Sequence, residues 1–425
     1  MTAGFLSTYF SAVVARRLTI VETTPSVSNQ HEFQGSSMFR AVFGSEKQRF
    51  NSDLFYLTDE DEPQTAKASL TWYDSRANDP KRSAEFRLYY TTDFIQQYAR
   101  AGDTLFVTTR KDGSVLVVVA AADSTTENQL LHLFGVDVAE GRVTKKLIAG
   151  DTDIVLNAAT TYILDSLGIV TIAPPPDAET IREIMVREFS LKLPDTKVFS
   201  AFVRNYVAKD VSPVDDPDAA FIKYWETERL FFDTIESEDI EQQLQAGFSG
   251  AKHLIDFAMS KLQARRSRVG QAFENHLESL FQANKIHLSR GAITENGNKP
   301  DFIFPGIGAY QDNAFPTDFL TMLGMKTTAK DRWRQVLAEA KRILYKHLAT
   351  LEPSISVKQT NQMQTRNLTL VLPSDIKATY KPEQHPALLT ISDFITLVRE
   401  RQTANGYVPA STATGLKSTR KNKKI

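Results

Sequence analysis

Two acidic residues and one lysine carry the chemistry that this sequence indicates first. Asp301 follows a proline at the start of the apolar run "DFIF", and Lys326 lies at the end of the next apolar run. If the two runs pair as a β-hairpin, the carboxylate and the ammonium lie side by side. A magnesium-dependent nuclease needs carboxylates because Mg²⁺ prefers oxygen ligands, and it gains from a lysine that orients water or offsets charge on the phosphate. The pair therefore predicts a site for phosphodiester hydrolysis.

The second acid of such a site must come from outside the lysine-bearing strand. The commonest nuclease pattern has an acid two positions before the lysine, but here that position is Gly324. Glu339 is the best substitute, because Arg332, Val336 and Glu339 follow the spacing i, i+4, i+7 of one helical face. We expect this helix to direct Glu339 to the metal and Arg332 to DNA. Glu274, in the helical pattern "GQAFENHLESLF", is a candidate for a further carboxylate.

The triplet Lys330, Asp331 and Arg332 could read a base pair. Lys and Arg can donate to guanine O6 and N7, and Asp can accept from cytosine N4. A charged helix N-terminus, in which the aspartate supports the helix dipole, is the alternative. Ordinary explanations also exist for the acids and the lysine: Pro-Asp is a common turn, and a Glu inside a helix usually forms an i, i+4 pair. The conjunction of these residues favours the nuclease interpretation.

Composition bounds the other possibilities. Hydrophobic residues make up 42% and charged residues 24% of the 425 residues, which is typical of a soluble fold with more than one domain. The net charge of −1 indicates that any nucleic-acid surface is local. The absence of cysteine excludes a thiolate nucleophile, disulfides and cysteine-based zinc modules. The longest apolar run, "VLVVVAAA", is too short to span a membrane. We expect a cytoplasmic protein with no membrane association and no small-molecule cofactor.

The chain changes character near a triple proline. Residues 68–122 are rich in strand patterns, with a hairpin turn at Lys111–Gly113, whereas residues 1–17 show the periodicity of an amphipathic helix. Beyond "APPPDAE", long helical patterns lead into alternating strands and helices, which predicts an α/β sheet. We predict four segments: a β-rich domain at 1–172, a Pro-rich linker at 173–183, an α/β domain at 184–402 and a flexible basic tail at 403–425.

Three segments of the second half carry a family resemblance. "RRSRVGQAFENHLESLF", "NKPDFIFPGIGAYQDNAFP" and "MKTTAKDRWRQVLAEAKRI" closely resemble the catalytic domain of EcoRII-like type II (type IIE) restriction endonucleases. The resemblance implies a PD-(D/E)xK-like fold in which one acid has moved from the strand to the following helix. It implies these roles: catalysis by Asp301, Lys326, Glu339, Tyr310 and Glu274, Mg²⁺ binding by Asp301 and Glu339, and reading of the C·G pairs of a CC…GG (CCWGG-like) site by Lys330, Asp331 and Arg332.

The first half resembles the same family less tightly. The matching segments are "TWYDSRANDPKRSAEFRLYY" and "NQHEFQG", where the family has a B3-like pseudobarrel that binds an effector copy of the site. The contacts to effector DNA implied by this resemblance are His31, Lys81, Arg82, Glu85 and Arg87. The basic cluster of the family is diluted here by Ala84, Phe86 and Leu88, and a solvated strand face is the alternative explanation for these charges.

These observations predict a homodimeric, Mg²⁺-dependent type II restriction endonuclease. It would cleave double-stranded DNA at a short palindrome, bind a second copy of the site through its amino-terminal domain, and be restrained by that domain. A two-fold palindrome calls for two active sites, one for each strand. The alternative from another class is a sequence-specific DNA-binding protein whose nuclease-like domain is inactive and serves dimerisation. A repair or recombination nuclease with little sequence dependence is a third interpretation.

Overall fold

The computed structural model describes residues 4–79, 81–138, 143–148, 153–169, 178–330 and 332–407. Asp331, residues 173–177 of the predicted linker and residues 408–425 of the predicted tail lie outside the described residues, so the predicted segment boundaries stay predictions. None of the helices in the described part of the chain is long and apolar enough to cross a membrane.

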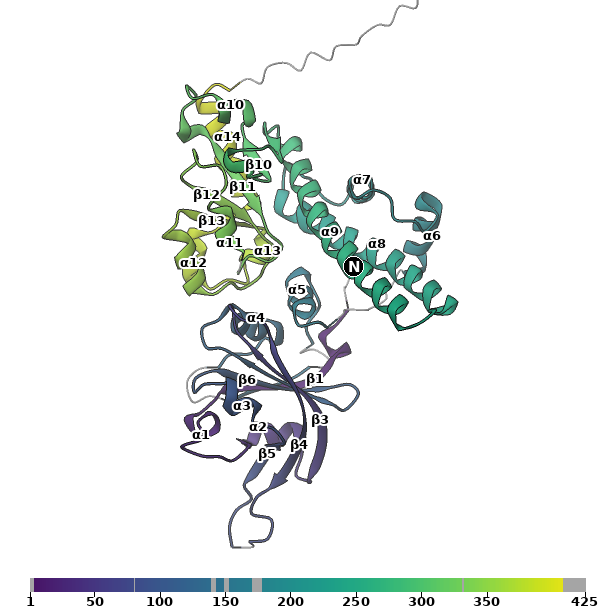
Figure 1. Ribbon diagram of the computed structural model, residues 1–425, viewed down its shortest axis with the longest axis vertical. Helices are drawn as coiled ribbons and strands as arrows, with labels where there is room; N and C mark the ends of the chain where they lie inside the picture. The colour runs from purple at the N-terminus through teal and green to yellow at the C-terminus, as the bar shows by residue number, and fades with distance from the viewer. Residues whose placement is uncertain are drawn as a thin grey trace, which may run out of the picture.

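The amino-terminal part is built around one large β-sheet, at the bottom of Figure 1. Eight strands follow the order β2-β5-β4-β3-β7-β6-β1-β8, and only the β3–β7 pair is parallel. The β-rich domain and the hairpin turn between β6 and β7 are as predicted, whereas the B3-like assignment stays a prediction. The elements are η1 (Leu6–Thr8), β1 (Phe10–Arg17), α1 (Ile20–Thr23), β2 (Glu32–Gln34), α2 (Ser37–Phe43), β3 (Gln48–Leu57), β4 (Gln64–Asp74), β5 (Phe86–Tyr90), α3 (Phe94–Tyr98), β6 (Thr104–Arg110), β7 (Val115–Ala120), α4 (Thr125–Phe134), β8 (Thr144–Leu147) and α5 (Ala158–Ser166).

The helix predicted for the first residues is wrong, because Phe10–Arg17 is strand β1. This strand pairs with β6 on one side and β8 on the other. Val14 packs into the core on one face of the sheet, while Val13 and Ala15 pack into the core on the other. A strand covered on both faces has no alternation of apolar and polar residues, so its sequence can be mistaken for a buried helix.

Between α5 and the second sheet, the described part of the chain forms a run of helices. They are α6 (Ala178–Phe189), α7 (Thr196–Tyr206), α8 (Pro217–Ala246) and α9 (Ala251–Ala283). Helix α8 joins two patterns that look separate in the sequence. Its core-facing residues Phe231 and Ile235 pack with Met185 and Phe199 from α6 and α7. The distal halves of α8 and α9 project away from the rest of the molecule, at the right of Figure 1.

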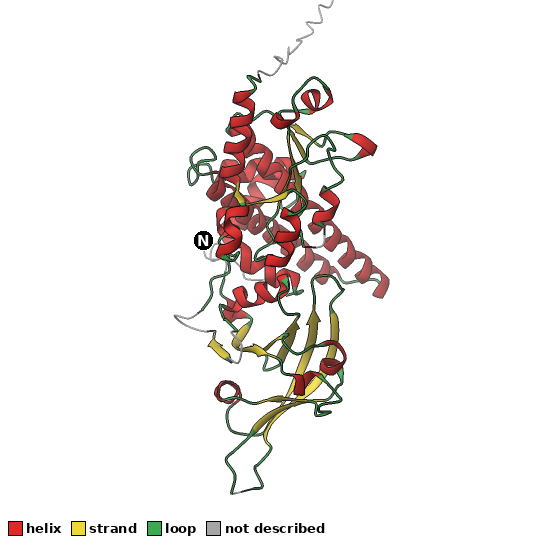
Figure 2. Cartoon of the chain, turned by 90° about the vertical axis from the view of Figure 1, so that its left-hand side faces the viewer, coloured by secondary structure: helices red, strands yellow, loops and turns green. Residues whose placement is uncertain are grey.

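The carboxyl-terminal part contains a second, six-stranded sheet with the order β14-β13-β12-β11-β10-β9. Strands β9, β10 and β11 are antiparallel, and β11 to β14 are parallel, so the predicted α/β sheet is confirmed. Figure 2 shows the helices gathered around this sheet, in contrast to the largely bare strands of the first one. The elements are β9 (Ser289–Arg290), η3 (Glu295–Gly297), β10 (Phe302–Phe304), α10 (Ile307–Gln311), η4 (Thr317–Phe319), β11 (Thr321–Met325), α11 (Trp333–Val336), β12 (Lys346–Ala349), α12 (Val357–Gln364), β13 (Leu368–Leu372), α13 (Ser374–Lys377), η5 (Pro382–Ala387), β14 (Leu389–Thr390) and α14 (Ile391–Ala404).

Helices α4 and α5 lie between the two sheets (Figure 1). Asp59 caps α4 by accepting hydrogen bonds from the backbone of Thr125 and Thr126, and it also accepts one from Gln359 of the carboxyl-terminal part, at 3.0 Å. Asp165 of α5 forms an ion pair with Arg229 of α8 at 2.8 Å. The two parts therefore touch through polar groups contributed mainly by α4 and α5.

Candidate active site

The β10–β11 hairpin brings Asp301 and Lys326 to the same edge of the second sheet. Phe302 pairs with Leu323, which places Asp301 beside the carboxyl end of β11, immediately before Lys326. The Met325 N–H donates to Asp301 Oδ2 at 2.6 Å and fixes the carboxylate there. The predicted pairing of the two apolar runs is thus confirmed, and the acid and the lysine lie where that pairing requires.

Glu339 also reaches this place, but not from a helix. Helix α11 ends at Val336 after a single turn, so Glu339 lies in the turn that follows, and the predicted helical face from Arg332 to Glu339 is wrong. Gly324 explains how its carboxylate enters. A Cβ at position 324 would lie 3.5 Å from Glu339 Oε2 and within 2.9 and 3.0 Å of the two Val336 methyl groups. Glu339 and Val336 therefore occupy the space beside β11 that a side chain at position 324 would need.

Burial shapes the electrostatics of the two acids. Burial raises the pKa of Asp301 to about 6, and the nearby Lys326 ammonium opposes this shift. Burial raises the pKa of Glu339 to about 7, again opposed by Lys326 and reinforced by the charge of Asp301. Because Lys326 lowers the pKa of both acids and the charge of Asp301 raises that of Glu339, the three charged groups form one electrostatic cluster. Strong shifts of this kind are enriched at functional sites.

The donor set fits a hard divalent cation. Glu339 Oε2 is buried and finds no hydrogen-bond partner among the described residues, and a buried carboxylate oxygen without a partner is costly. Within the same part of the chain, no group of three or more His, Cys, Asp or Glu side chains is arranged to hold a metal. Two carboxylates suffice for Mg²⁺ in sites where water and substrate phosphate supply the other ligands. Asp301 and Glu339 are therefore suited to hold such an ion.

Glu274 lies near Asp301 but is already engaged. Its charge is among the causes that raise the pKa of Asp301, and its Oε2 accepts hydrogen bonds from Arg290 at 3.1 and 2.7 Å. Arg290 also donates to Glu278 at 2.6 Å and to Asn275 at 2.9 Å. Glu274 thus acts on Asp301 electrostatically, while its own carboxylate is held by Arg290. Nothing in the sequence singled out Arg290.

Tyr310 lies away from the charged cluster. Its hydroxyl donates to the Glu295 carboxylate at 2.7 Å, and burial together with this bond raises the pKa of Tyr310 to about 12. The hydroxyl also accepts from the backbone N–H of Arg342 at 3.3 Å. Among the described contacts none joins Tyr310 to Asp301, Lys326 or Glu339. Tyr310 therefore holds the backbone of the segment that follows Glu339, and in the described part of the chain it does not contact the charged cluster.

The predicted base-reading triplet lies at the amino end of α11. Arg332 is exposed and occupies the N-cap position, whereas Asp331 lies outside the described residues. Glu352, which is 1% exposed, accepts hydrogen bonds from the backbone of Ala329 and Lys330 at 2.5 and 2.9 Å. The Lys330 ammonium donates to Thr126 of α4 at 3.3 Å. The segment is therefore anchored by a buried acid and partly covered by the amino-terminal domain.

The predicted effector contacts gather around one edge of the first sheet. His31 precedes β2, stacks on Tyr90 and contacts Gln96 at 3.1 Å, and β2 pairs with β5, which carries Arg87. Lys81 and Arg82 are exposed in the turn between β4 and β5. Glu85 forms ion pairs with Arg87 and also with Arg76, a residue the sequence interpretation missed although it directly follows β4. Glu85 therefore neutralises part of the basic charge at this edge.

Comparisons with known proteins find a resemblance in the second half of this chain. Residues 232–395 match the family model described as EcoRII C terminal. Over 213 residues the chain is 35% identical to the type II restriction enzyme EcoRII of Escherichia coli, covering 50% of this chain and 52% of that protein. Residues 232–395 are therefore similar to the EcoRII C-terminal family.

Two further relatives extend the comparison. The type II restriction enzyme SsoII of Shigella sonnei is 32% identical over 158 residues, covering 35% of this chain and 50% of that protein. This chain spans about half the length of the curated relatives that it matches. Among solved structures, metal-depleted Ecl18kI in complex with uncleaved, modified DNA matches with a TM-score of 0.45 and 21% identity, covering 55% of this chain and 87% of that one.

The close packing around Gly324 gives a stability prediction. Gly324→Ala forces the Val336 methyl groups to move, and overpacking of this kind costs about 1–3 kcal/mol. We expect the thermal unfolding midpoint of the variant to fall by several degrees. The matched control is Gly308→Ala in α10, where an added Cβ meets no atom within 4 Å. Equal midpoints for the two variants would show that the space beside β11 is not contested.

Proposed function

We propose that this protein is a type II restriction endonuclease that hydrolyses double-stranded DNA with Mg²⁺ at a short palindromic site of the CC…GG (CCWGG-like) type. The observation that carries the proposal is the convergence of Asp301, Lys326 and Glu339 at the end of β11, within the residues that match the EcoRII C-terminal family model. The names of the relatives EcoRII and SsoII, both type II restriction enzymes, support the same activity.

The residues of the cluster divide the work of phosphodiester hydrolysis. Asp301 is held by the Met325 N–H with its carboxylate toward Lys326, and Glu339 presents an oxygen that no described protein group engages. These two would hold the metal, which when bound supplies Lewis acidity and lowers the pKa of a bound water. The Lys326 ammonium then lies where it offsets negative charge that develops on the phosphate. Partial burial strengthens this effect because the local dielectric constant is low.

A plasmid digestion tests the activity. The protein should cut a plasmid that carries CCWGG-type sites and leave a site-free plasmid intact. Asp301→Ala, Lys326→Ala and Glu339→Ala should each abolish cutting yet keep site-specific binding, because the cluster acts on the phosphate and base contacts lie elsewhere. A wild-type protein that binds the site without cutting would support the alternative, a DNA-binding protein with an inactive domain. Cutting of both plasmids alike would indicate a nuclease without sequence preference.

Arg332 is the residue we assign to base reading with the most structural support. It is exposed at the N-cap of α11, and its segment is fixed by Glu352 through the neighbouring backbone. An arginine held in this way can donate to guanine O6 and N7. Lys330 and Asp331 complete the proposed reading triplet.

Arg332→Ala should weaken specific binding by about 1–3 kcal/mol and relax discrimination at one base pair. Binding to a set of single-base variants of the site measures this. The control is Arg334→Ala, because Arg334 is also exposed but lies over the Trp333 ring and donates to Gln362. A loss that is uniform over all sequences would make Arg332 a phosphate contact instead.

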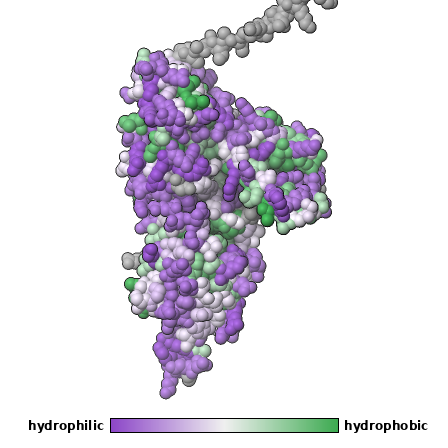
Figure 3. Space-filling view, viewed as in Figure 1, coloured by the Kyte–Doolittle hydropathy of each residue, from purple (hydrophilic) through white to green (hydrophobic). Residues whose placement is uncertain are grey.

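The proposed homodimer has a candidate surface on the distal halves of α8 and α9. Figure 3 shows apolar atoms gathered on the lobe that these helices form. Five large apolar side chains there are between 47% and 61% exposed: Leu244, Leu254, Ile255, Met259 and Leu262. On α9, Ile255, Met259 and Leu262 follow the spacing of one helical face. Exposed apolar patches mark interaction sites, and a two-fold copy of the same surface would cover this one.

Charges beside this surface are compatible with a second copy. Glu241 near the end of α8 and Arg266 on α9 are exposed, and neither forms an ion pair within the described residues. A two-fold axis brings the acid of one copy toward the base of the other. Pairing by this surface would also give the two active sites that a palindrome requires.

The amino-terminal domain is proposed to bind a second DNA copy and to restrain cleavage until it does so. Two contacts support the restraint. Thr126 of α4 engages the Lys330 ammonium, and Gln129 donates to Glu352 at 3.4 Å and to the Pro353 carbonyl at 3.1 Å. A base-reading lysine cannot contact α4 and a base at once. DNA bound to Lys330 and α4 in its described position therefore compete.

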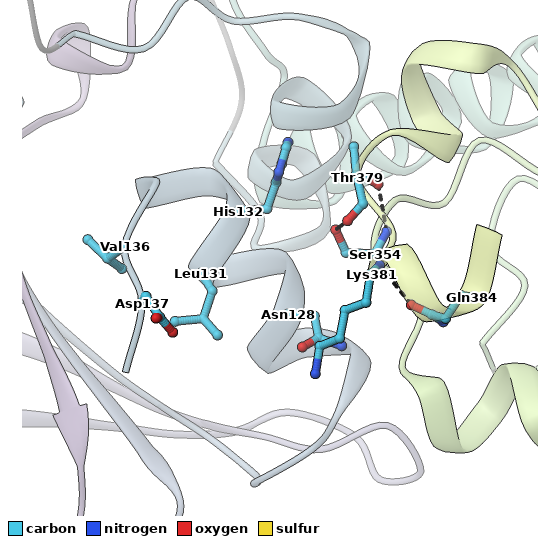
Figure 4. Close-up of a pocket in the computed structure, with 9 residues that line it drawn as sticks. All are labelled: Asn128, Leu131, His132, Val136, Asp137, Ser354, Thr379, Lys381 and Gln384. Carbon is cyan, nitrogen blue, oxygen red and sulfur yellow. Dashed lines mark hydrogen bonds between the residues drawn. The ribbon is translucent and has the colours of Figure 1, made fainter. Parts of the chain in front are cut away.

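The contact between the domains is incompletely packed. A cavity of about 250 Å³ lies between α4 and the loops before α12 and around η5 (Figure 4). Polar side chains from both sides, among them His132, Lys381 and Gln384, line it. An interface that borders a polar pocket open to solvent buries less apolar surface than a closely packed one, and relative domain motion is the default unless the interface is large and hydrophobic. This supports a reversible restraint.

Gln129→Glu tests the restraint in the full chain. The new carboxylate would face the Glu352 carboxylate, and like charges at a buried contact repel. We expect several-fold faster cutting of a one-site plasmid without added duplex, and less stimulation by a short duplex that carries the site. Asn128→Asp makes the same chemical change one residue away, without a described contact to Glu352 and in the pocket that Lys381 also lines, so it should not speed the cutting. Equal rates for Gln129→Glu and wild type would mean that α4 does not restrain cleavage.

A further inference from the structure

We propose that Lys346 is a positioning residue that holds the turn carrying Glu339, so that the Glu339 carboxylate points into the metal site. The proposal rests on the proposed nuclease function and adds to it a residue outside the predicted catalytic set. Lys346 touches none of the reacting atoms, and its role is exerted through the backbone of residues 339 and 340.

Lys346 is unusual because it buries its charge against backbone carbonyls. It is the first residue of β12 and is 6% exposed. Its ammonium donates to the Glu339 carbonyl and, at 2.7 Å, to the Ala340 carbonyl. The described residues place no carboxylate within ion-pairing distance of Nζ. A buried charge is rarely the most stable choice for a core position, so a specific geometric use explains this lysine better than stability does.

The turn that Lys346 holds lies outside regular secondary structure. Helix α11 ends at Val336, and beyond it the Glu339 N–H donates to the Val336 carbonyl at 3.1 Å and the Ala340 carbonyl accepts from the Ile343 N–H at 2.9 Å, so isolated turn bonds replace the continuous bonding of a helix. Ala340 has a φ of 44°, in the left-handed region that residues with a Cβ rarely adopt. Such a conformation costs free energy and persists only when neighbouring groups impose it. The two bonds from the Lys346 ammonium fall on either side of this strained residue.

Lys346 is the centre of a wider set of anchors on the same turn. Each residue from 338 to 342 has a backbone group that bonds to a side chain of another segment. Besides those of Lys346, the bonds run from Asn298 Nδ2 to Ala338 O at 2.9 Å, from Lys341 N to Glu295 Oε2 at 3.3 Å, and from Arg342 N to the Tyr310 hydroxyl at 3.3 Å. Side chains from η3 and its C-cap, from α10 and from β12 thus form hydrogen bonds to five consecutive residues. A turn exposed to solvent would not need so many bonds.

These backbone hydrogen bonds matter because one oxygen of the Glu339 carboxylate, Oε2, is not held by any hydrogen bond among the described residues. The direction of the side chain therefore depends on where its backbone is held and on the space left by Gly324. Groups that orient a metal ligand in this way typically change metal affinity or activity by about 10–100-fold when removed.

Lys346→Met in the full chain tests the inference. The variant keeps the apolar stem and removes the two bonds to the turn. We expect it to cut the site-bearing plasmid at least about tenfold more slowly at limiting Mg²⁺ and to recover most of the loss at high Mg²⁺. Binding to the uncleaved site without Mg²⁺ should stay within twofold of wild type. Lys346→Arg, whose guanidinium can donate to both carbonyls, should restore part of the metal affinity.

A matched control separates this role from a general effect on folding. Lys377 also donates to a backbone carbonyl, that of Leu388 at 2.8 Å, but this carbonyl directly precedes β14, which is three strands away from β11 in the sheet. Lys377→Met should therefore leave the Mg²⁺ dependence unchanged. If Lys346→Met does not fold, Asn298→Ala removes a neighbouring anchor of the same turn, and it should shift the Mg²⁺ dependence in the same direction.

Different outcomes overturn different claims. A Lys346→Met protein with the Mg²⁺ dependence of wild type, or with an equal loss at every Mg²⁺ concentration, overturns the positioning role while the nuclease assignment stands. An unchanged Mg²⁺ dependence in Asn298→Ala, where that variant is needed, does the same. A wild-type protein that cuts no DNA at any Mg²⁺ concentration overturns the proposed function itself.

Discussion

The missing side chain at Gly324 is the constraint on which the candidate active site depends. Strand β11 delivers Lys326 to the sheet edge, and an acid two positions earlier would be the simplest companion for it. The space beside that position is instead filled by Val336 and by the carboxylate of Glu339. Once the acid comes from a separate segment, its direction is no longer set by the strand. The direction of the Glu339 carboxylate must then be set by packing at Val336 and by the hydrogen bonds that hold residues 338–342.

This displacement has an electrostatic consequence. Burial raises the pKa of both Asp301 and Glu339; the charge of Glu274 raises the pKa of Asp301 further, and the charge of Asp301 raises that of Glu339 further. Lys326 offsets part of this repulsion, but a divalent cation would offset more of it, because two positive charges then face two carboxylates. The arrangement is therefore strained without the ion and relieved with it. Raised pKa values and an unpartnered oxygen are two signs of the same preorganisation.

The sequence was sufficient for part of this picture, and the reasons are physical. Asp301 and Lys326 were predictable because antiparallel pairing of the two apolar runs brings the start of the first run beside the end of the second. Glu339 was found for the wrong structural reason, since its spacing fits a helix that ends three residues earlier. Lys346 and Glu352 were missed because their roles lie in contacts to backbone groups brought close by parallel strand pairing. Strand β1 was mistaken for a helix because burial on both faces removed its alternation.

Glu352 connects the catalytic domain to the amino-terminal one through a single carboxylate. One of its oxygens accepts from the backbone of Ala329 and Lys330, and the other faces Gln129 of α4. The segment proposed to read bases and the helix proposed to restrain it are therefore anchored on the same buried group. Lys330 also contacts α4 through its ammonium. If α4 moves away, the ammonium of Lys330 is released, while the hydrogen bonds from the backbone of Ala329 and Lys330 to Glu352 remain. The reading segment can thus keep its shape in both states, and only the side chain that must meet DNA has to change its partner.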